Sequence, residues 1–215
     1  NFKINPKDLK KAITKKTKVF LFSSPCNPTG SVYSKKELIA LGKVFKNYKN
    51  TIIISDEIYE HINFTKNHFS IGRIRDLKDQ VVTINGLSKG YAMTGWRFGY
   101  LGAPKEIAKA CIKMQGQITS ATCSITQRAA ITALSKKPNC TYRMRDQFRN
   151  RRNLMIKLLS KIKDLKLNKP EGAFYIFPNI CNYIGRSYNQ YQIHSADDLV
   201  IFLLEEGGVS TVSGS

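Results

Sequence analysis

The sequence predicts an α/β fold in which a mainly parallel sheet forms a large first domain and a small α+β domain follows it. Short, continuously apolar runs alternate with segments of helical periodicity through most of the chain. Such alternation is typical of parallel sheets covered by helices on both faces. Each apolar run ends in a polar, turn-rich segment, and the pattern changes beyond residue 165. The length of 215 residues allows two parts, because domains usually contain about 100 to 200 residues.

Three short runs of apolar and β-branched residues are the predicted strands: Thr17–Phe22, Thr51–Ile54 and Val81–Ile84. A helix is predicted between the first two strands. Ser34 and Glu37 have the spacing of a capping box, in which each side chain satisfies a backbone N–H of the other residue. The apolar residues that follow recur at helical spacing: Leu38, Leu41, Val44, Phe45 and Tyr48.

Three further helices are predicted after the third strand. The first runs from Pro104, which suits a first turn because no N–H is needed there, to about Gln117. The second covers Ile125–Leu134, and the third is a long helix from Tyr142 to about Leu165 that we interpret as the connection between domains. The predicted division is 1–141 for part of the large domain, 142–165 for the connecting helix and 166–215 for part of the small domain.

Two elements are predicted in the small domain. The run Ala173–Phe177 has the pattern of a strand and is followed by Pro178, which ends it. Ser195 and Asp198 form a second capping box, and the helix that they open stops at the glycine pair 207–208. A strand and a helix in this order indicate an α+β domain.

The chain carries 35 basic and 15 acidic residues, for a formal net charge of +20. Such a charge would suit a nucleic-acid-binding protein, because lysine and arginine neutralise phosphates. The lysines, however, are spread over predicted helix surfaces, and the dense arginines between Arg143 and Arg152 fall on more than one face of a helix. We therefore expect a solvated surface and no nucleic-acid partner.

Other classes of protein are disfavoured by what the sequence lacks. The apolar runs are too short to cross a bilayer, so we expect no membrane partner and, by default, a cytoplasmic location. The five cysteines are scattered singly and the three histidines lack the spacing of metal ligands. We therefore expect reduced thiols and assign no metal site.

Three unusual motifs follow the three predicted strands: SPCNPTG, SDEIYE and NGLSKGYAMTGWRFGY. Ligands of parallel sheets bind beyond the carboxyl ends of the strands, so we expect the motifs to meet in one site. Lys89 lies in the third motif, among several glycines. A lysine after a strand is far more often a solvated surface residue than a nucleophile, and the loop matches no nucleotide-binding motif. Lys89 alone therefore does not define a function.

The three motifs, in this order, resemble the signature blocks of class I/II aminotransferases, fold type I enzymes that depend on pyridoxal phosphate (PLP). They are most similar to those of bacterial aspartate aminotransferases. GAFYIFP and the final DDLVIFLLEEGGVSTVSGS resemble the small domain of this family, so the resemblance covers nearly the whole chain. It implies the large domain of a PLP-dependent transferase, pyridoxal 5′-phosphate as cofactor, and a homodimer with active sites at the subunit interface.

The resemblance implies roles for a lysine and an aspartate. Lys89 would form an imine with the cofactor aldehyde and, once an amino acid displaces it, move the proton of the substrate Cα as general base and acid. Asp56 would hold the proton on the pyridine nitrogen that makes the cofactor an electron sink. The alternative for Asp56 is the N-cap of a helix starting at Glu57. We favour the cofactor role because Lys89 follows 33 residues later.

Four further residues match cofactor-binding positions of the family. Tyr59 and Asn27 would donate hydrogen bonds to the phenolic oxygen of the cofactor, and a helical first turn after Asp56 would aim Tyr59 at the site. Arg97 would grip the cofactor phosphate with its planar fork, and Ser88 would add a hydroxyl there. The alternatives are that Tyr59 only packs, that Asn27 and Ser88 only shape turns, and that Arg97 stacks on the neighbouring tryptophan.

The implied reaction is the transfer of an amino group between an amino acid and a 2-oxo acid by a ping-pong mechanism, with aspartate and 2-oxoglutarate as the leading pair. Aromatic or prephenate aminotransferases, aminocyclopropane-carboxylate synthase and C–S lyases remain alternatives, as does a non-catalytic, basic, nucleic-acid-binding relative. Against the family pattern, we expect the chain to be a fragment truncated at both ends. It lacks the phosphate-binding glycine loop, the stacking aromatic residue and the substrate-binding arginine, so we expect the isolated fragment to be inactive.

Overall fold

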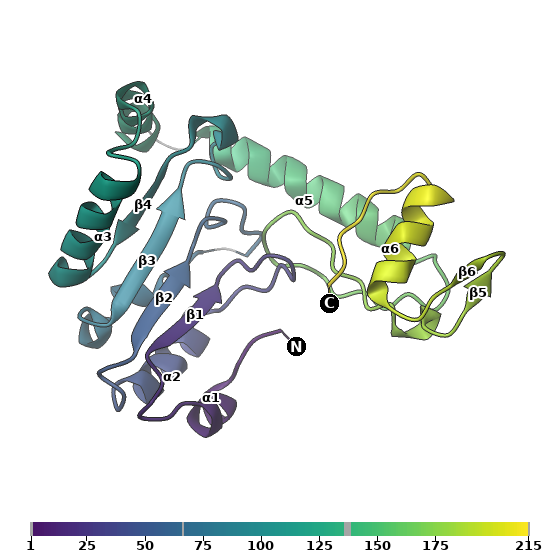
Figure 1. Ribbon diagram of the computed structural model, residues 1–215, viewed down its shortest axis with the longest axis horizontal. Helices are drawn as coiled ribbons and strands as arrows, with labels where there is room; N and C mark the ends of the chain where they lie inside the picture. The colour runs from purple at the N-terminus through teal and green to yellow at the C-terminus, as the bar shows by residue number, and fades with distance from the viewer. Residues whose placement is uncertain (1, 66, 136–138, 215) are drawn as a thin grey trace.

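The computed structural model describes residues 2–65, 67–135 and 139–214. Four strands form one sheet in chain order: β1 (Val19–Ser23), β2 (Ile52–Asp56), β3 (Val81–Gly86) and β4 (Gly99–Gly102) (Figure 1). The first three strands run parallel, and β4 is antiparallel to β3. The predicted α/β fold with a mainly parallel sheet is thus confirmed. The strand β4 lies in the glycine-rich motif, where the sequence indicates only a loop.

Two helices cover one face of this sheet: α1 (Pro6–Ala12) and α2 (Lys35–Phe45). The predicted capping box opens α2, because Ser34 Oγ accepts the N–H of Glu37 and the Glu37 carboxylate accepts the N–H of Ser34. The apolar sides of both helices join the sheet in one core, whose buried members are Leu9, Ile13, Tyr33, Leu38, Leu41, Val44, Phe45, Ile53, Ile71, Leu77 and Val81. Short 3₁₀ helices complete the fold: η1 (Ile71–Arg73), η2 (Arg75–Leu77), η3 (Thr94–Trp96) and η4 (Cys181–Tyr183).

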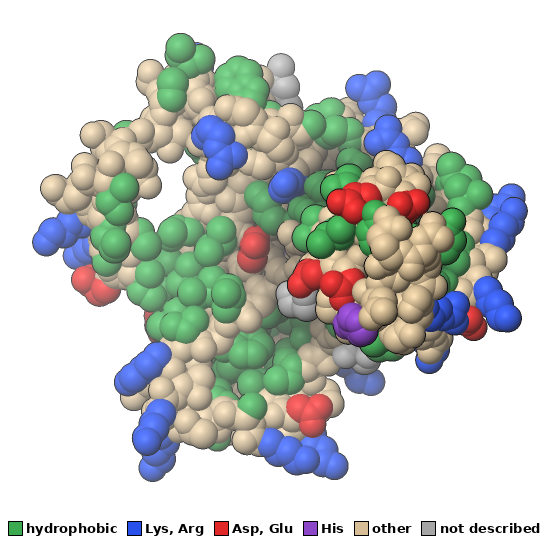
Figure 2. Space-filling model, turned by 45° about the vertical axis from the view of Figure 1, so that its right-hand side comes forward, with side chains coloured by type: hydrophobic (Ala, Val, Ile, Leu, Met, Phe, Trp, Pro, Cys, Tyr) green, Lys and Arg blue, Asp and Glu red, His purple; other side chains and the backbone are tan. Residues whose placement is uncertain are grey.

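The next two helices, α3 (Lys105–Ile118) and α4 (Ser124–Ser135), lie close to their predicted positions. Pro104 is the N-cap of α3 rather than part of its first turn as predicted, because its ψ of 145° is extended backbone. None of the residues of α3 is buried, so this helix does not cover the sheet as α2 does. Hydrophobic side chains such as Leu21 of β1 are correspondingly exposed, and Figure 2 shows such side chains gathered on one face of the molecule.

The long helix α5 spans Asn139–Leu159 and leads from the sheet toward the C-terminal part of the chain (Figure 1). It ends before Leu165, so the predicted extent of the connecting helix is wrong at this end. The N–H of Ile162 bonds to the carbonyl of Leu159, three residues back, and Asp164 has a left-handed φ of +66°. The chain therefore tightens into short turns and changes direction instead of continuing the helix.

The arginines of α5 point in different directions, as the spacing of the arginine-rich stretch predicts. Arg145 and Arg149 both pair with Asp146 along the helix surface. Arg152 instead donates a hydrogen bond from Nη1 to the Pro170 carbonyl at 2.8 Å, and its guanidinium lies 4.6 Å from the ring centre of Phe64. These side chains bind other parts of the same chain rather than forming a single cationic stripe.

The C-terminal part contains a small antiparallel sheet, β5 (Ser187–Tyr188) with β6 (Tyr191–Gln192), and the helix α6 (Ala196–Glu205). The predicted capping box of Ser195 and Asp198 is present at the start of α6. Sheet and helix together match the α+β composition expected here. Within the described residues, every helix is too short or too polar to span a bilayer.

The predicted strand Ala173–Phe177 does not form. The backbone at its start is bonded to loops of the large domain instead: Gly172 donates its N–H to the Gly30 carbonyl at 2.9 Å, and Ala173 donates to the Ile62 carbonyl at 2.8 Å. Ala173 also has a left-handed φ of +56°, which lies outside the β region. Long-range docking therefore overrides the local strand pattern.

Candidate active site

The carboxyl ends of the three parallel strands lie side by side. In the register of the sheet, Ser23 at the end of β1 is opposite Asp56 at the end of β2, and Asp56 is opposite Ile84 of β3. Lys89 lies in the turn that follows β3. The structure therefore brings the three motifs to one edge of the sheet, as expected from their positions after the strands.

Lys89 is half-buried between aromatic rings. Its Nζ lies 5.9 Å from the ring centre of Tyr59 and 5.6 Å from that of Phe174. The turn that carries it packs closely, since a Cβ atom at Gly90 would lie 2.7 Å from Cδ2 of His61. A larger residue at position 90 would therefore require the His61 side chain to shift.

Asp56 is the last residue of β2, and its Oδ1 accepts the N–H of Ile58 at 3.1 Å. The residues after it form turns, not the helix that the sequence suggests, so Asp56 is the acceptor of an Asx-type turn rather than a helix N-cap. The tight turn still places Tyr59 at the same edge of the sheet. The side chain of Tyr59 is therefore oriented toward the site by a turn of the backbone, and not by the first turn of a helix as predicted.

The neighbouring carboxylate, Glu57, is buried, and sequence reasoning gave it no role. Its Oε1 accepts the Ser55 hydroxyl at 2.9 Å and its Oε2 pairs with His68 Nε2 at 2.7 Å. Glu60 lies close to this pair and accepts the side-chain N–H of Asn85 at 2.8 Å. These bonds hold the turn after β2 against the sheet. The only sequence signal for them is a charged residue directly beside Asp56.

Tyr59 is almost fully buried, with 2% of its surface exposed. Its hydroxyl lies 2.6 Å from the hydroxyl of Tyr175, which follows the docked segment at Ala173. Burial raises the pKa of Tyr59 well above its ordinary value, and the nearby charge of Asp56 raises that pKa further. The Tyr59 hydroxyl therefore keeps its proton and can donate it in a hydrogen bond. Sequence reasoning did not identify Tyr175 or Phe174 as site residues.

The other three predicted site residues are not joined to Lys89 by the contacts of the described residues. Asn27 is exposed and precedes a cis peptide bond to Pro28. Arg97 is exposed, has a left-handed φ of +53° and donates from Nη1 to the Thr94 carbonyl at 3.0 Å. Ser88 is half-buried beside Lys89. Their cofactor-binding roles stay predictions.

The chemistry of the residues that are brought together fits the implied cofactor. The amine of Lys89 suits an aldehyde, the carboxylate of Asp56 suits a protonated ring nitrogen, and the protonated hydroxyl of Tyr59 suits a phenolic oxygen. The three groups approach one another from two adjacent strand ends. Their chemistry therefore fits a planar ring that carries an aldehyde, a protonated nitrogen and a phenolic oxygen.

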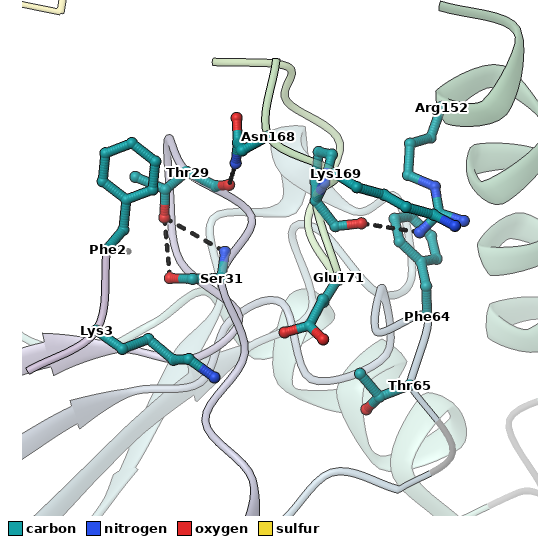
Figure 3. A pocket seen from close by; sticks show the side chains of 11 residues that line it. Phe2, Lys3, Thr29, Ser31, Phe64, Thr65, Arg152, Asn168, Lys169 and Glu171 are labelled. Carbon is teal, nitrogen blue, oxygen red and sulfur yellow. Dashed lines mark hydrogen bonds between the residues drawn. The ribbon is translucent and has the colours of Figure 1, made fainter. Parts of the chain in front are cut away.

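A cavity of about 510 Å³ lies elsewhere, between the N-terminal segment, the loop after β1 and the segment after α5 (Figure 3). In it the Asn168 amide donates to the Thr29 carbonyl at 2.9 Å, and Arg152 reaches across to Pro170. The lining residues are Phe2, Lys3, Thr29, Ser31, Phe64, Thr65, Arg152, Asn168, Lys169, Pro170 and Glu171. Because none of the predicted site residues lines it, we interpret the cavity as a junction between segments.

Comparisons with known proteins show which family the chain resembles over its full length. Residues 1–215 match the family model described as aminotransferase class I and II. An aspartate/prephenate aminotransferase of Cereibacter sphaeroides and an aspartate aminotransferase of Bacillus subtilis are each 42% identical to the chain over 217 residues. Both alignments cover 100% of this chain and 54% of the relative, so the chain spans about half the length of the curated relatives it matches.

Solved structures give the same result. The aspartate aminotransferase from Rhizobium meliloti has a TM-score of 0.93 at 35% identity, covering 99% of this chain and 54% of that one. An aromatic aminotransferase from Pyrococcus horikoshii OT3 has a TM-score of 0.90 at 35% identity, covering 100% of this chain and 55% of that one. The similarity therefore extends over both the sheet and the C-terminal part.

Proposed function

Because this chain belongs to the class I and II aminotransferase family, we propose that the intact protein transfers an amino group between an amino acid and a 2-oxo acid by a ping-pong mechanism with pyridoxal 5′-phosphate. The observation that carries this proposal is the half-buried Lys89 beside Tyr59, at the strand edge where Asp56 ends β2. Aspartate and 2-oxoglutarate are the proposed substrates, because relatives over the full chain are named aspartate aminotransferases.

Lys89 has two roles in this proposal. The cofactor, when bound, supplies a sink for the electrons of the substrate Cα–H bond. The Lys89 amine holds the cofactor covalently at its aldehyde carbon, and after release it accepts the Cα proton and returns it. The aromatic rings of Tyr59 and Phe174 lie beside Nζ, and the Lys89 side chain is half-buried. One residue thus serves as anchor and as proton carrier.

The remaining residues hold the ring and the phosphate. Asp56 keeps a proton on the pyridine nitrogen, and Tyr59 donates its hydroxyl proton to the phenolic oxygen together with the Asn27 amide. Arg97 binds the phosphate, because its planar fork matches two phosphate oxygens, and Ser88 adds a hydroxyl there. Arg97 is exposed and donates from Nη1 to the Thr94 carbonyl within its own turn, so the fork can turn toward a phosphate.

The proposal for the whole protein includes partners and location. We infer a homodimer in the cytoplasm whose small-molecule partners are an amino acid and a 2-oxo acid. Aromatic amino acids or prephenate form the second candidate substrate class, favoured by relatives named aspartate/prephenate and aromatic aminotransferase. Initial rates of the intact enzyme with aspartate, phenylalanine and prephenate would rank these substrates.

The anchor role of Lys89 is tested by expressing the intact protein, reducing the bound cofactor with borohydride and mapping the adduct by mass spectrometry. We expect the adduct on Lys89 and its loss in Lys89→Ala. Lys105, an exposed lysine at the start of α3, provides the control Lys105→Ala, which should keep the adduct. An adduct on another lysine would remove Lys89 from the mechanism.

The role of Asp56 is tested by Asp56→Ala in the same protein. We expect some cofactor to remain bound through Lys89, while turnover falls by about a hundredfold or more, as for other charge-stabilising groups in active sites. Asp79→Ala changes an exposed aspartate just before β3 and should leave turnover unchanged. Unchanged turnover in Asp56→Ala would show that this carboxylate does not act on the cofactor.

A further inference from the structure

We propose that Tyr175 is a positioning residue of the active site, whose hydroxyl orients the Tyr59 hydroxyl toward the cofactor. This inference rests on the proposed function and assigns a role to a segment that the motifs at the strand ends do not include. Tyr175 lies 116 residues beyond Tyr59 in the chain, and their hydroxyl oxygens are 2.6 Å apart. The contact reaches the site from the C-terminal side of α5.

The segment before Tyr175 is fixed to the sheet domain by its backbone. Gly172 and Ala173 donate their N–H groups to the carbonyls of Gly30 and Ile62, at 2.9 and 2.8 Å. A Cβ at Gly172 would lie 2.5 Å from Cβ of Pro25, so the backbone passes too close to that loop for a larger residue. The segment is therefore clamped between the loop after β1 and the turn after β2.

The docked segment places two aromatic rings, those of Phe174 and Tyr175, beside the site. Phe174 lies 5.6 Å from Lys89 Nζ and stacks on Phe148 of α5, with ring centres 5.2 Å apart and planes inclined by 28°. Tyr59 meets both rings edge-on, at 5.3 Å from Phe174 and 5.9 Å from Tyr175. The rings surround Tyr59 and leave its hydroxyl with Tyr175 as its hydrogen-bond partner.

A tyrosine hydroxyl has one proton to donate and lone pairs to accept, so either hydroxyl can donate in the bond between Tyr59 and Tyr175. When Tyr175 donates to the Tyr59 oxygen, the single proton of Tyr59 is directed away from Tyr175. In the proposed function, that proton is the one that Tyr59 donates to the phenolic oxygen of the cofactor. A donor that is itself hydrogen-bonded donates more strongly, because successive hydrogen bonds polarise one another. Tyr175 therefore strengthens the bond that Tyr59 makes.

The predicted consequence is a shift in the pH at which the linkage between Lys89 and the cofactor loses its proton. A strong donor at the phenolic oxygen stabilises the deprotonated linkage, in which that oxygen keeps its negative charge. Weakening the donor therefore raises the pH midpoint of the titration. Because Tyr175 acts through Tyr59, its effect must depend on the Tyr59 hydroxyl.

The experiment titrates the visible absorbance of the bound cofactor against pH in the intact holoenzyme, for wild type, Tyr175→Phe, Tyr59→Phe and the double variant. We expect Tyr175→Phe to raise the midpoint by about half a pH unit or more, a roughly threefold change in the proton equilibrium. Tyr59→Phe should raise it at least as much. The double variant should match Tyr59→Phe, because the two hydroxyls act in series.

Tyr183→Phe is the matched control. Its hydroxyl donates to the Lys163 carbonyl at 2.6 Å, away from Lys89, so the midpoint should not move. Thermal melts of all variants check that the fold is kept. A Tyr175→Phe midpoint equal to that of wild type, with Tyr59→Phe shifted, would overturn the positioning role and leave the proposed function intact. A wild-type protein without a titrating cofactor band would overturn both.

Discussion

The two faces of the four-stranded sheet have similar residues and different surroundings. On the face under α1 and α2, Ile53 is 0% exposed and Val81 is 5% exposed. On the opposite face, Val19 is 51%, Leu21 is 67% and Ile84 is 39% exposed. Both faces are apolar, as a parallel sheet buried on both sides requires. An apolar pattern therefore indicates that a face is suited to burial. Among the described residues, the buried helix positions pack on one of the two faces, although Val82 on the other face is also only 5% exposed.

The covered face gives the sheet its rigidity, and the candidate site lies at the carboxyl edge that both faces share. Asp56 belongs to the same register row as Ile84, so it stands at the end of the open face. The chain spans about half the length of its curated relatives. We expect other parts of the intact protein to cover the open face.

The largest expected effect on the free energy of unfolding comes from a substitution in the core under the covered face. Phe45 of α2 is 0% exposed in the core, so Phe45→Ala should lower the free energy of unfolding by about 3–5 kcal/mol, through lost burial and the cavity left behind. Urea unfolding of the 215-residue chain measures this loss. Phe2→Ala, at a half-exposed position, is the matched control and should have a much smaller effect. Equal losses would mean that the core is not where the structure places it.

The next effect concerns the attachment of α2 to that face. Ser34→Ala removes the cap of α2 and should lower the free energy of unfolding by about 1 kcal/mol. Ser195→Ala removes the equivalent cap of α6, which has no buried residue. The Ser195 variant should therefore fray α6 locally without shifting the main unfolding transition. Similar shifts in both variants would contradict the view that only α2 is part of the cooperative core.

A smaller effect depends on pH. Burial works to raise the pKa of Glu37, but hydrogen bonds from Lys3 and Ser34 outweigh it and hold that pKa below its ordinary value. A carboxylate with a lowered pKa stabilises the fold above its ordinary pKa, and this contribution is lost as the pH falls through the folded-state value. The advantage of wild type over Glu37→Gln should therefore be present at pH 7 and shrink below pH 4.5.

Urea midpoints of both proteins at pH 7 and in acid measure this change. Glu106→Gln alters an exposed glutamate of α3, away from the covered face, and should give no comparable pH dependence. An advantage of wild type over Glu37→Gln that stayed constant across this range would show that the charge of Glu37 contributes nothing.

Local signals in the sequence predicted the parts of the fold that are locally determined. The capping boxes at Ser34 and Ser195 and the three parallel strands were predicted because spacing and composition within a few residues decide them. The placement of Lys89 and Asp56 at one edge followed from the rule for parallel sheets, although their identification as site residues needed a family resemblance.

Long-range contacts explain what sequence reasoning missed. The run Ala173–Phe177 reads as a strand, yet its start is docked to Ile62, more than a hundred residues earlier in the chain. The same docking brings Tyr175 to Tyr59, and the local sequence around either residue does not predict this contact. The end of α5 was missed for a related reason, because the apolar periodicity continues past the left-handed turn at Asp164.

The smallest expected effect in the 215-residue chain is also the sharpest test of the comparison. Leu21 lies on the open face, so Leu21→Ala should change the free energy of unfolding by less than about 0.5 kcal/mol, as at other exposed positions. In the intact protein the same substitution should cost about 2–5 kcal/mol, because we expect that face to be buried. Leu41→Ala, on the covered side, should be strongly destabilising in both proteins. If Leu21→Ala caused an equally small loss of stability in both proteins, the open face would be exposed to solvent in the intact protein as well. Its apolar residues would then need another explanation.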